Sequence, residues 1–423
     1  MHILIEAVGS AGDVHPFLAI GQALTARGHE VDIVTSAYFA ERVAQAGLGF
    51  IPVGTLEDYQ RAISQLDLWH PRRAFNAVWR ESKSQILPVF ELLQQHIRHN
   101  ETVLVGSTLA WSVRFAQERL GIPAATVHLS PSCILSAEAP PRLPGLGRWF
   151  QHMPVSWRRT FLEWMEKKFL DSVIKHDLNV MRGQIGLPPV SHVFSRWQHS
   201  PQSVICAFPD WFCQLQPDWP AHSVITGFPL WRMPGTPAAL TPRLEAFLAD
   251  GTVPIGFTPG SAMAFGRPFF ERAMNACEKL GRRAVFITPF SEQLPWRDGE
   301  APAFIHHERY VPFDVLVPRL AAFVHHGGIG TTAQAMHAGV PQLIVPFAHD
   351  QFDNAARVER LGCGASIPAG ARSGKWVTTL SRLLTSQQIN AACQRVSASM
   401  ADETGVLEQI VAHIEALKAG AAP

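Results

Sequence analysis

The chain has 423 residues, a length that suits two domains of roughly 200 residues each better than one core. Apolar residues make up 47% of it and charged residues only 17%, which excludes a disordered chain and a highly charged nucleic-acid wrapper. The formal net charge of +1 provides no overall field for holding DNA or RNA, so we expect no nucleic-acid partner.

The cysteines and the N-terminal segment indicate the compartment. Six scattered cysteines form no C-x-x-C pair, which predicts reduced core thiols rather than disulfides or a zinc site. The N-terminus lacks a basic leader, and Glu6 and Asp13 interrupt its apolar stretch, so we expect the fold to begin at once. Because no run of about 18 apolar residues occurs, no spanning helix is predicted. These features favour the cytoplasm.

The first half of the chain predicts alternating strands and helices. An apolar strand at 3–8 precedes a Gly-rich turn at 9–12 and a helical pattern at 14–26. Further patterns follow, with strands at 31–35, 102–106 and 124–129 and a helix at 111–120. Alternation of this kind is typical of a parallel sheet wrapped by helices.

The second half repeats this alternation, with strands expected at 253–257, 284–287, 322–325 and 342–345. The Pro- and Gly-dotted stretch before it, including Met233–Pro237, predicts a linker at 218–242. We therefore expect two Rossmann-like α/β domains, at 1–217 and 243–404, that face a central cleft. A final helical pattern within 405–423 could belong to the second domain or cross back to the first.

The stretch from His325 to Thr332 predicts a phosphate site. A strand ending in His325 and His326 precedes a turn with glycines at 327, 328 and 330, and a helix begins near Thr331. Such glycines let the backbone approach a ligand, and the unpaired N–H groups at a helix N-terminus attract an anion. His326 can add a hydrogen bond to a phosphate oxygen. The alternative is a Gly-rich turn needed only for packing.

Two more turns in the second half could contact the same ligand, because ligands bind at the carboxyl ends of parallel strands. Asp350 and Gln351 follow the strand at 342–345 and offer a carboxylate and an amide, which suit sugar hydroxyls. Asp350 could instead cap the next helix. Gly260 and Ser261 follow the strand at 253–257 and offer backbone and hydroxyl donors.

These motifs resemble those of the family-1 glycosyltransferases of the GT-B fold. The resemblance rests on three motifs in order: His326-Gly327-Gly328, Gly339-Val340-Pro341 and Asp350-Gln351. It implies a nucleotide-sugar donor whose diphosphate is held by His326, Gly328, Gly330 and Thr331, with Gly260 and Ser261 assisting and Asp350 and Gln351 reading the sugar. Tyr310 and Val311 fall where the family has Trp-x-Pro, so Tyr310 is the expected platform for the base, with a buried aromatic as the alternative.

The turn from Ser10 to Pro16 carries the candidate catalytic base. Transfer to a hydroxyl needs a general base within reach of the acceptor O–H, and Asp13 and His15 are both eligible. The family resemblance supports Asp13, because bacterial antibiotic and lipid glycosyltransferases carry Gly-Asp-x-x-Pro here, and it implies that Gly12 lies beside the donor. A helix cap is the alternative role for Asp13, and a surface position is the alternative for His15.

An inverting, metal-independent mechanism follows from this reading. The chain has no D-x-D triplet and no histidine set with metal-ligand spacing, so we expect no metal and no cofactor beyond the nucleotide sugar. Asp13 would deprotonate the acceptor, and the second domain would stabilise the departing nucleoside diphosphate as the domains close.

The segment 149–170 bears on the acceptor. It is rich in bulky apolar residues, with Phe161 and Trp164 on one helical face and several basic residues beside them. This face could line a channel for a hydrophobic acceptor, touch a membrane peripherally, or pack against the first sheet. We keep Phe161, Trp164 and His15 as candidates on the acceptor side.

Dispersed matches, among them Gly9–Val14, Ser130–Ser132 and Ala348–Asn354, make the chain similar to the rhamnosyltransferases of rhamnolipid biosynthesis. This similarity implies transfer of L-rhamnose from dTDP-L-rhamnose to a 3-(3-hydroxyalkanoyloxy)alkanoate, a lipid that a partner enzyme could supply. The expected product is a rhamnolipid biosurfactant. His326 departs from the proline expected there in the rhamnosyl enzymes, which leaves glucosyl transfer from UDP-glucose open.

A different class of function is also open. The chain could be a catalytically silent GT-B protein that binds or activates a partner. The combined presence of Asp13, His326, Asp350 and Gln351 argues against that alternative.

Overall fold

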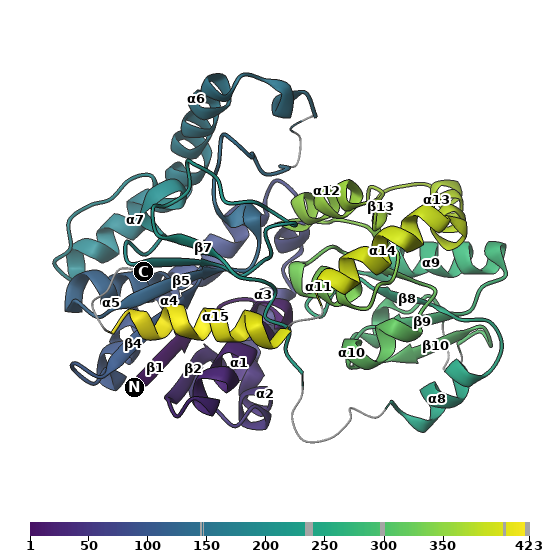
Figure 1. Ribbon diagram of the computed structural model, residues 1–423, viewed down its shortest axis with the longest axis horizontal. Helices are drawn as coiled ribbons and strands as arrows, with labels where there is room; N and C mark the ends of the chain where they lie inside the picture. Colours follow the sequence, from purple (N-terminus) through teal and green to yellow (C-terminus); the bar gives the residue numbers. More distant parts are fainter. Residues whose placement is uncertain (144–145, 147, 233–239, 297–300, 401–402, 419–423) are drawn as a thin grey trace. The chain divides into compact units, whose positions relative to one another are not determined.

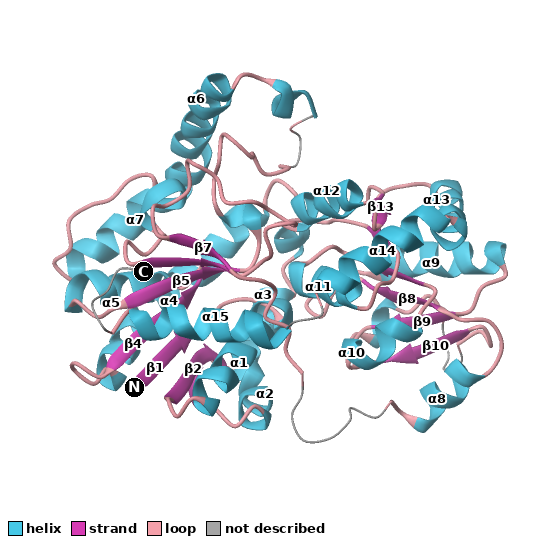
Figure 2. Cartoon of the chain, in the orientation of Figure 1, coloured by secondary structure: helices cyan, strands magenta, loops and turns pink. Residues whose placement is uncertain are grey.

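The computed structural model describes residues 1–143, 146, 148–232, 240–296, 301–400 and 403–418. The chain divides into two compact units. Unit 1 comprises Met1–Leu68, Arg72–Trp231 and Glu403–Pro423, and unit 2 comprises Trp69–Pro71 and Arg232–Asp402. Each unit contains a parallel sheet between helices, as Figure 2 shows, which confirms the predicted fold of two α/β domains.

The sheet of unit 1 has seven strands within the described residues, and every pairing is parallel. From one edge to the other the order is β3 (Gly49–Val53), β2 (Glu30–Ser36), β1 (His2–Glu6), β4 (Thr102–Ser107), β5 (Ala124–His128), β6 (Ser203–Cys206) and β7 (Ser223–Ile225). The strand order therefore reverses between β1 and β4, as in doubly wound sheets.

Helices cover the two faces of this sheet because the central strands are apolar on both sides. Leu4 and Leu104 pack on one face against α4 (Ala74–His96), α5 (Trp111–Leu120) and α7 (Asp171–Gln184). Ile3 and Ile5 point to the opposite face and are fully buried there. The remaining helices of unit 1 are α1 (Ala11–Ala26), α2 (Ala40–Gln45), α3 (Leu56–Ile63), α6 (Val155–Met165) and α15 (Glu403–Ala416).

The last helix, α15, packs on the first one, α1, although the two lie at opposite ends of the sequence (Figure 1). Glu415 on α15 pairs with Arg27 at 2.8 Å and with His29 at 2.7 Å, just after α1 ends. Gly227, in the loop after β7, lets α15 come close to that loop as well, because a Cβ atom there would lie 2.4 Å from the side chain of Val406. The C-terminal helix is thus part of unit 1.

The sheet of unit 2 is parallel and repeats this strand order. Its six strands within the described residues run in the order β10 (Ile305–Glu308), β9 (Ala284–Ile287), β8 (Ile255–Thr258), β11 (Ala322–His325), β12 (Gln342–Ile344) and β13 (Gly364–Ser366). The reversal lies between β8 and β11. The helices are α8 (Pro242–Ala249), α9 (Arg267–Leu280), α10 (Phe313–Leu316), α11 (Ile329–His337), α12 (Gln351–Leu361), α13 (Ser373–Thr385) and α14 (Gln387–Ser399).

The expected linker at 218–242 differs from what the structure shows. Residues 223–225 form β7 and pair with β6, which adds a partly buried edge strand to the first sheet. Unit 1 accordingly continues to Trp231. The Pro- and Gly-rich residues 233–239 lie outside the described residues. Among the helices that are described, none is both long enough and apolar enough to cross a bilayer.

Candidate active site

Each sheet offers one place where a ligand can enter between loops. Where the strand order reverses, the loops at the carboxyl ends of the two central strands turn in opposite directions and leave a crevice. In unit 1 these loops follow β1 and β4, and in unit 2 they follow β8 and β11. Asp13 follows β1, and Ser261 and His326 follow β8 and β11, whereas Asp350–Gln351 and Tyr310–Val311 follow two other strands of unit 2, β12 and β10.

Asp13 lies in the first turn of α1, directly after the loop that follows β1. Its Oδ2 accepts hydrogen bonds from the backbone N–H of Ser10 at 2.8 Å and from the Ser10 hydroxyl at 3.0 Å. Gly9 has a φ of 137°, and a Cβ atom there would lie 2.4 Å from the carboxylate. Asp13 is therefore not the N-cap itself, as the alternative from the sequence had it; Ser10 is the N-cap, and Asp13 is its capping-box partner three residues later.

The capping role uses only one of the two carboxylate oxygens. No described residue donates a hydrogen bond to Oδ1 of Asp13, which leaves this oxygen for an external O–H. Burial raises the pKa of Asp13 above its usual value, against the two hydrogen bonds from Ser10, which lower it. A raised pKa makes the ionised carboxylate a stronger base, as general-base catalysis requires.

The surroundings of Asp13 correct one prediction. His15 is half-buried rather than on the surface, because its ring packs on Trp231 with 4.7 Å between the centroids. Burial, helped by Arg42, lowers the pKa of His15 to about 4, so this ring is neutral near pH 7. Gly12, which the resemblance assigns to the donor, is half-buried in the first turn of α1.

Glu6 is a carboxyl group whose role the sequence did not reveal. It is the last residue of β1, is 4% exposed and accepts a hydrogen bond from the Ser112 hydroxyl. The backbone N–H of Val113 also contributes, so Glu6 serves the N-terminal turn of α5. Burial raises the pKa of Glu6 to about 7. The sequence signal that could have identified Glu6 is a charged residue at the end of an otherwise apolar strand.

In unit 2, His325 orders the loop that follows β11. Its Nδ1 accepts the backbone N–H of Gly327 at 3.1 Å, so its proton is on Nε2, which donates to Oε1 of Gln342 at 2.9 Å. The ring is fully buried, and burial lowers its pKa to about 4. His325 is therefore a neutral positioning residue.

His326 lies between two glycines. A Cβ atom at Gly260 would be 3.0 Å from the ring, and one at Gly328 would be 2.5 Å from Nε2. Burial lowers the pKa of His326 to about 3, and Nδ1 has no partner among the described residues. Because an unpaired buried acceptor costs less than an unpaired donor, we assign the proton to Nε2, which can donate to a ligand oxygen.

The same loop carries the start of α11. Gly327 has a φ of 94°, and a Cβ atom there would lie 2.6 Å from Ile344. Gly328 is the N-cap, and Thr332 is the first residue of the helix whose N–H bonds back to it, at 3.0 Å. The N–H groups of residues 329–331, which include Gly330 and Thr331, thus have no intrahelical acceptor. N–H groups of this kind can bind an anion, and His326 lies beside them.

Asp350 and Gln351 lie at the start of α12, and the structure connects them to the glycine loop. Asn354 donates to Oδ2 of Asp350 at 2.7 Å and to the carbonyl oxygen of Gly327 at 2.9 Å. Oε1 of Gln351 accepts the N–H groups of Phe347 and Ala348, so its amide N–H₂ is the part left for a sugar. Asn354 was missed as a site residue, although its position four residues after Asp350 placed both on one helix face.

The other donor-side candidates occupy different environments. Tyr310 is 46% exposed, which rules out the buried-aromatic alternative and leaves its ring accessible to a base. The side chain of Val311 is buried in a core cluster, so only its backbone can meet a nucleotide. Ser261 is exposed on the loop after β8.

Phe161 and Trp164, the remaining acceptor-side candidates, lie on α6. Their rings contact each other at 5.7 Å, and Phe161 also contacts Phe150. Phe161 is half-buried in a small cluster around Phe150 and Leu162, whereas Trp164 is exposed. Both therefore remain predictions for the acceptor.

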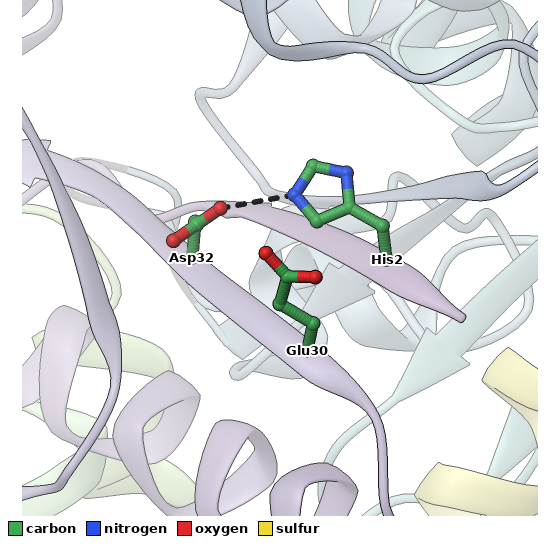
Figure 3. A group of neighbouring side chains, drawn as sticks. All are labelled: His2, Glu30 and Asp32. Atoms are coloured by element: carbon green, nitrogen blue, oxygen red, sulfur yellow. Dashed lines mark hydrogen bonds and ion pairs between the residues drawn. The ribbon is translucent and has the colours of Figure 1, made fainter.

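One group of side chains has the spacing of a metal site. Among the described residues this group consists of His2, Glu30 and Asp32, which lie at the start of β1 and β2 (Figure 3). His2 bonds to Asp32 at 2.9 Å, and Glu30 pairs with Arg98 at 2.5 Å. These are the amino ends of the strands, away from Asp13, so we interpret the group as a cluster of ion pairs that stabilises β1 and β2. The expectation of a metal-independent reaction stays a prediction.

Comparisons with known proteins identify the family of this chain. Residues 3–137 match the glycosyltransferase family 28 N-terminal domain, and residues 286–417 match the C-terminal domain of the erythromycin biosynthesis protein CIII-like family. The O-mycaminosyltylonolide 6-deoxyallosyltransferase of Streptomyces fradiae is 30% identical, over 96% of this chain and 95% of its own length. The chain is a GT-B glycosyltransferase of the antibiotic type.

Two more of these comparisons bear on the fold and the substrates. The vancomycin aglycone glucosyltransferase of Amycolatopsis orientalis is 31% identical, over 86% of each chain. The solved structure of the glycosyltransferase VinC in complex with dTDP has a TM-score of 0.68 at 17% identity and covers all of both chains, which confirms the GT-B fold. Because these glycosyltransferases differ in sugar and acceptor, they do not assign the substrates of this one.

Proposed function

We propose that this glycosyltransferase moves L-rhamnose from dTDP-L-rhamnose to the hydroxyl of a 3-(3-hydroxyalkanoyloxy)alkanoate. One observation carries the donor half of the proposal. The neutral ring of His326 is held between Gly260 and Gly328 beside the unpaired N–H groups at the start of α11. A diphosphate fits this set because every group offered is a hydrogen-bond donor at a positive dipole end.

The acceptor half of the reaction rests on Asp13. Its Oδ1 takes the proton of the acceptor hydroxyl, the hydroxyl oxygen forms a bond to the anomeric carbon, and the bond from that carbon to the diphosphate oxygen breaks. The electron pair leaves on the diphosphate. Attack opposite the leaving group inverts the anomeric configuration. Ser10 keeps the carboxylate oriented throughout, since both of its donors bond to Oδ2.

The departing dTDP carries the charge that develops in the transition state. The N–H groups of residues 329–331 and Nε2 of His326 can stabilise that charge without a metal ion. Asp350 and the amide N–H₂ of Gln351 bind the sugar hydroxyls, and Asn354 fixes Asp350 relative to the glycine loop. Tyr310 stacks on the base, and the backbone of Val311 lies beside it.

A deoxyhexose and a lipid are chosen for separate reasons. The 6-deoxyallosyltransferase relative, named for a 6-deoxyhexose, supports a deoxy sugar. The dispersed sequence matches to rhamnolipid enzymes and the apolar segment with Phe161 and Trp164 support a hydrophobic acceptor. Because such a lipid is itself an enzymatic product, we place the reaction in the cytoplasm, at the inner membrane face, downstream of an acyl-chain condensing partner.

Glucosyl transfer from UDP-glucose to the same lipid is the second candidate. The observation that favours it is His326, which stands where we expect proline in rhamnosyl enzymes. The glucosyltransferase among the relatives points the same way. Rhamnose and glucose differ by few hydroxyl contacts, so Asp350 and Gln351 would decide between them.

The test is a direct transfer assay. The purified chain is incubated with the hydroxyacid dimer and either dTDP-L-rhamnose or UDP-glucose, and product masses and anomeric configurations are measured. We expect the rhamnolipid as the main product, with inverted configuration and no loss of rate in excess EDTA.

Other outcomes have clear meanings. A glucolipid as the main product would replace the first candidate with the second. Absence of glycolipid with either donor, while dTDP still binds, would refute the proposal of a lipid acceptor.

A further inference from the structure

Aromatic side chains gather on one exposed part of unit 1. We call the residues Trp149, Trp157, Trp164 and Phe169 the aromatic ridge. Their exposed fractions run from 49% to 66%, and every exposed tryptophan of the described residues belongs to the ridge. Trp157 and Trp164 are seven residues apart on α6 and therefore share one face. Figure 1 shows α6 standing out from the rest of unit 1.

Ring contacts run through three of the four ridge residues. Trp149 contacts Phe150, which contacts Phe161, which contacts Trp164, which contacts Phe169, with centroid separations of 5.1 to 6.1 Å. Phe150 is buried and Phe161 is half-buried, so these two rings support the exposed ones. The ridge is therefore a cluster of exposed aromatic residues on a common support, not isolated apolar residues of the kind that every protein exposes.

A π-helical turn between α6 and α7, at Glu166–Leu170, fixes the direction of this surface. Glu166 points inward and accepts the N–H groups of Phe194 and Ser195 at 3.0 and 2.8 Å. Lys167, Lys168 and Phe169 are exposed on the same turn. The turn thus combines one buried anchor, Glu166, with three consecutive exposed residues that follow it.

The exposed charges beside the ridge are mainly positive. Lys167, Lys168 and Lys175 are exposed, and none of them has an acidic ion-pair partner among the described residues. Glu163 is the exposed acidic residue on α6. Tryptophan rings with adjacent free lysines suit the boundary between the headgroups and acyl chains of an anionic bilayer.

We propose that the aromatic ridge docks this enzyme on the surface of an anionic lipid bilayer. The tryptophan rings enter the interfacial layer while Lys167 and Lys168 meet the lipid phosphates. The inference rests on the proposed function in one respect: docking would bring the enzyme to a lipid acceptor that is held in the bilayer. The free lysines favour a bilayer over a second copy of the chain, because two copies would bring like charges together.

The experiment is vesicle flotation with the full chain and no nucleotide sugar or acceptor, so its outcome is independent of transfer. We expect binding to vesicles of phosphatidylcholine with phosphatidylglycerol, weaker binding at high salt, and little binding to phosphatidylcholine alone. The double variant Lys167→Gln/Lys168→Gln should weaken binding roughly thirtyfold. Trp149→Ser/Trp157→Ser should weaken it roughly tenfold.

Matched controls test whether exposed apolar area alone is responsible. Leu66→Ser and Leu215→Ser remove side chains that are 64% and 54% exposed elsewhere on unit 1, and they should leave flotation unchanged. Far-ultraviolet circular dichroism checks that each variant is folded. Absence of flotation, or equal binding to neutral vesicles, would overturn the proposal. So would a dimer, seen by light scattering, that the tryptophan variant dissociates, because the ridge would then be an interface between copies.

Discussion

The two sheets reverse their strand order in the same way, but the loops at the two reversals carry different ionisable groups, carboxyls in unit 1 and imidazoles in unit 2. At the carboxyl end of β1 in unit 1 lie the carboxyls of Glu6 and Asp13, and burial raises the pKa of each, while it lowers the pKa of His15 in the same helix turn. At the carboxyl end of β11 in unit 2 lie the rings of His325 and His326, and burial lowers the pKa of each. Burial favours the neutral form in both cases.

In the proposed reaction this difference divides the work, because unit 1 takes the proton and unit 2 holds the diphosphate. A carboxyl with a raised pKa is a better proton acceptor, which suits the side that meets a hydroxyl. An imidazole with a lowered pKa keeps one N–H at neutral pH and meets the diphosphate as a neutral donor, while the helix start supplies the positive potential. The comparison therefore predicts which substitutions change chemistry, stability or binding.

The largest effect is expected for Asp13→Asn, which removes the base from unit 1 and leaves unit 2 untouched. We expect the turnover number to fall roughly 10²- to 10⁴-fold, because the amide cannot take the acceptor proton. The affinity for dTDP, measured by calorimetry, should not change. A variant that transfers sugar at the parent rate would refute the base assignment.

Ser10→Ala sharpens the same assignment. It removes a donor that lowers the pKa of Asp13, so the acidic limb of the rate profile should move to higher pH, while Ser10→Thr should keep it in place.

Glu6→Gln tests whether burial acts on stability in unit 1. The folded state holds the Glu6 proton more tightly than the unfolded chain, so stability falls as the pH rises from 4.5 through about 7. The cost above that window is roughly 3 kcal/mol. Thermal unfolding should therefore show Glu6→Gln to be more stable than the parent near pH 8 and similar to it near pH 4.5. Equal melting temperatures at both pH values would contradict the raised pKa.

The two histidines of unit 2 should separate binding from folding. His326→Ala should weaken dTDP binding roughly ten- to hundredfold with a small change in melting temperature, since it deletes a donor to the phosphate. His325→Ala leaves Gln342 and the N–H of Gly327 unpaired and should cost about 1–3 kcal/mol of stability. His326→Gln, which keeps a donor, is the control.

The low pKa of His326 adds a second readout. Because the ring is neutral throughout, affinity for the nucleotide sugar should stay level between about pH 5.5 and 8. An affinity that rises steeply below about pH 6.5 would show a charged ring instead.

The smallest effect is expected at Asn354, which connects the sugar loop to the glycine loop. Asn354→Ala removes both hydrogen bonds, and the donor KM should rise roughly five- to tenfold with a smaller change in kcat. Asn354→Asp cannot donate and places a carboxylate against Asp350, so it should be worse than alanine. Equal losses of kcat and kcat/KM for both variants would indicate a different role.

Much of the fold was readable from local patterns. The strands at 284–287 and 322–325 and the helix at 111–120 begin and end where the sequence places them, because long buried runs and helix signals are local properties. The strands at the sheet edges, β3, β7, β10 and β13, were missed, and so was β6. Edge strands are short and partly exposed, so their patterns are weak without their neighbours.

The sequence by itself determined the two α/β domains, the glycine turn at 327–330 and the chemical types at the site, because these depend on residue type and spacing. Only the tertiary structure decided what each group does. Folding brought Gly260 against His326, and Asn354 against Gly327. It also buried Glu6 and packed Val406 on Gly227. Burial and contact between distant residues set pKa values and proton positions, and neither is encoded in any single stretch of chain.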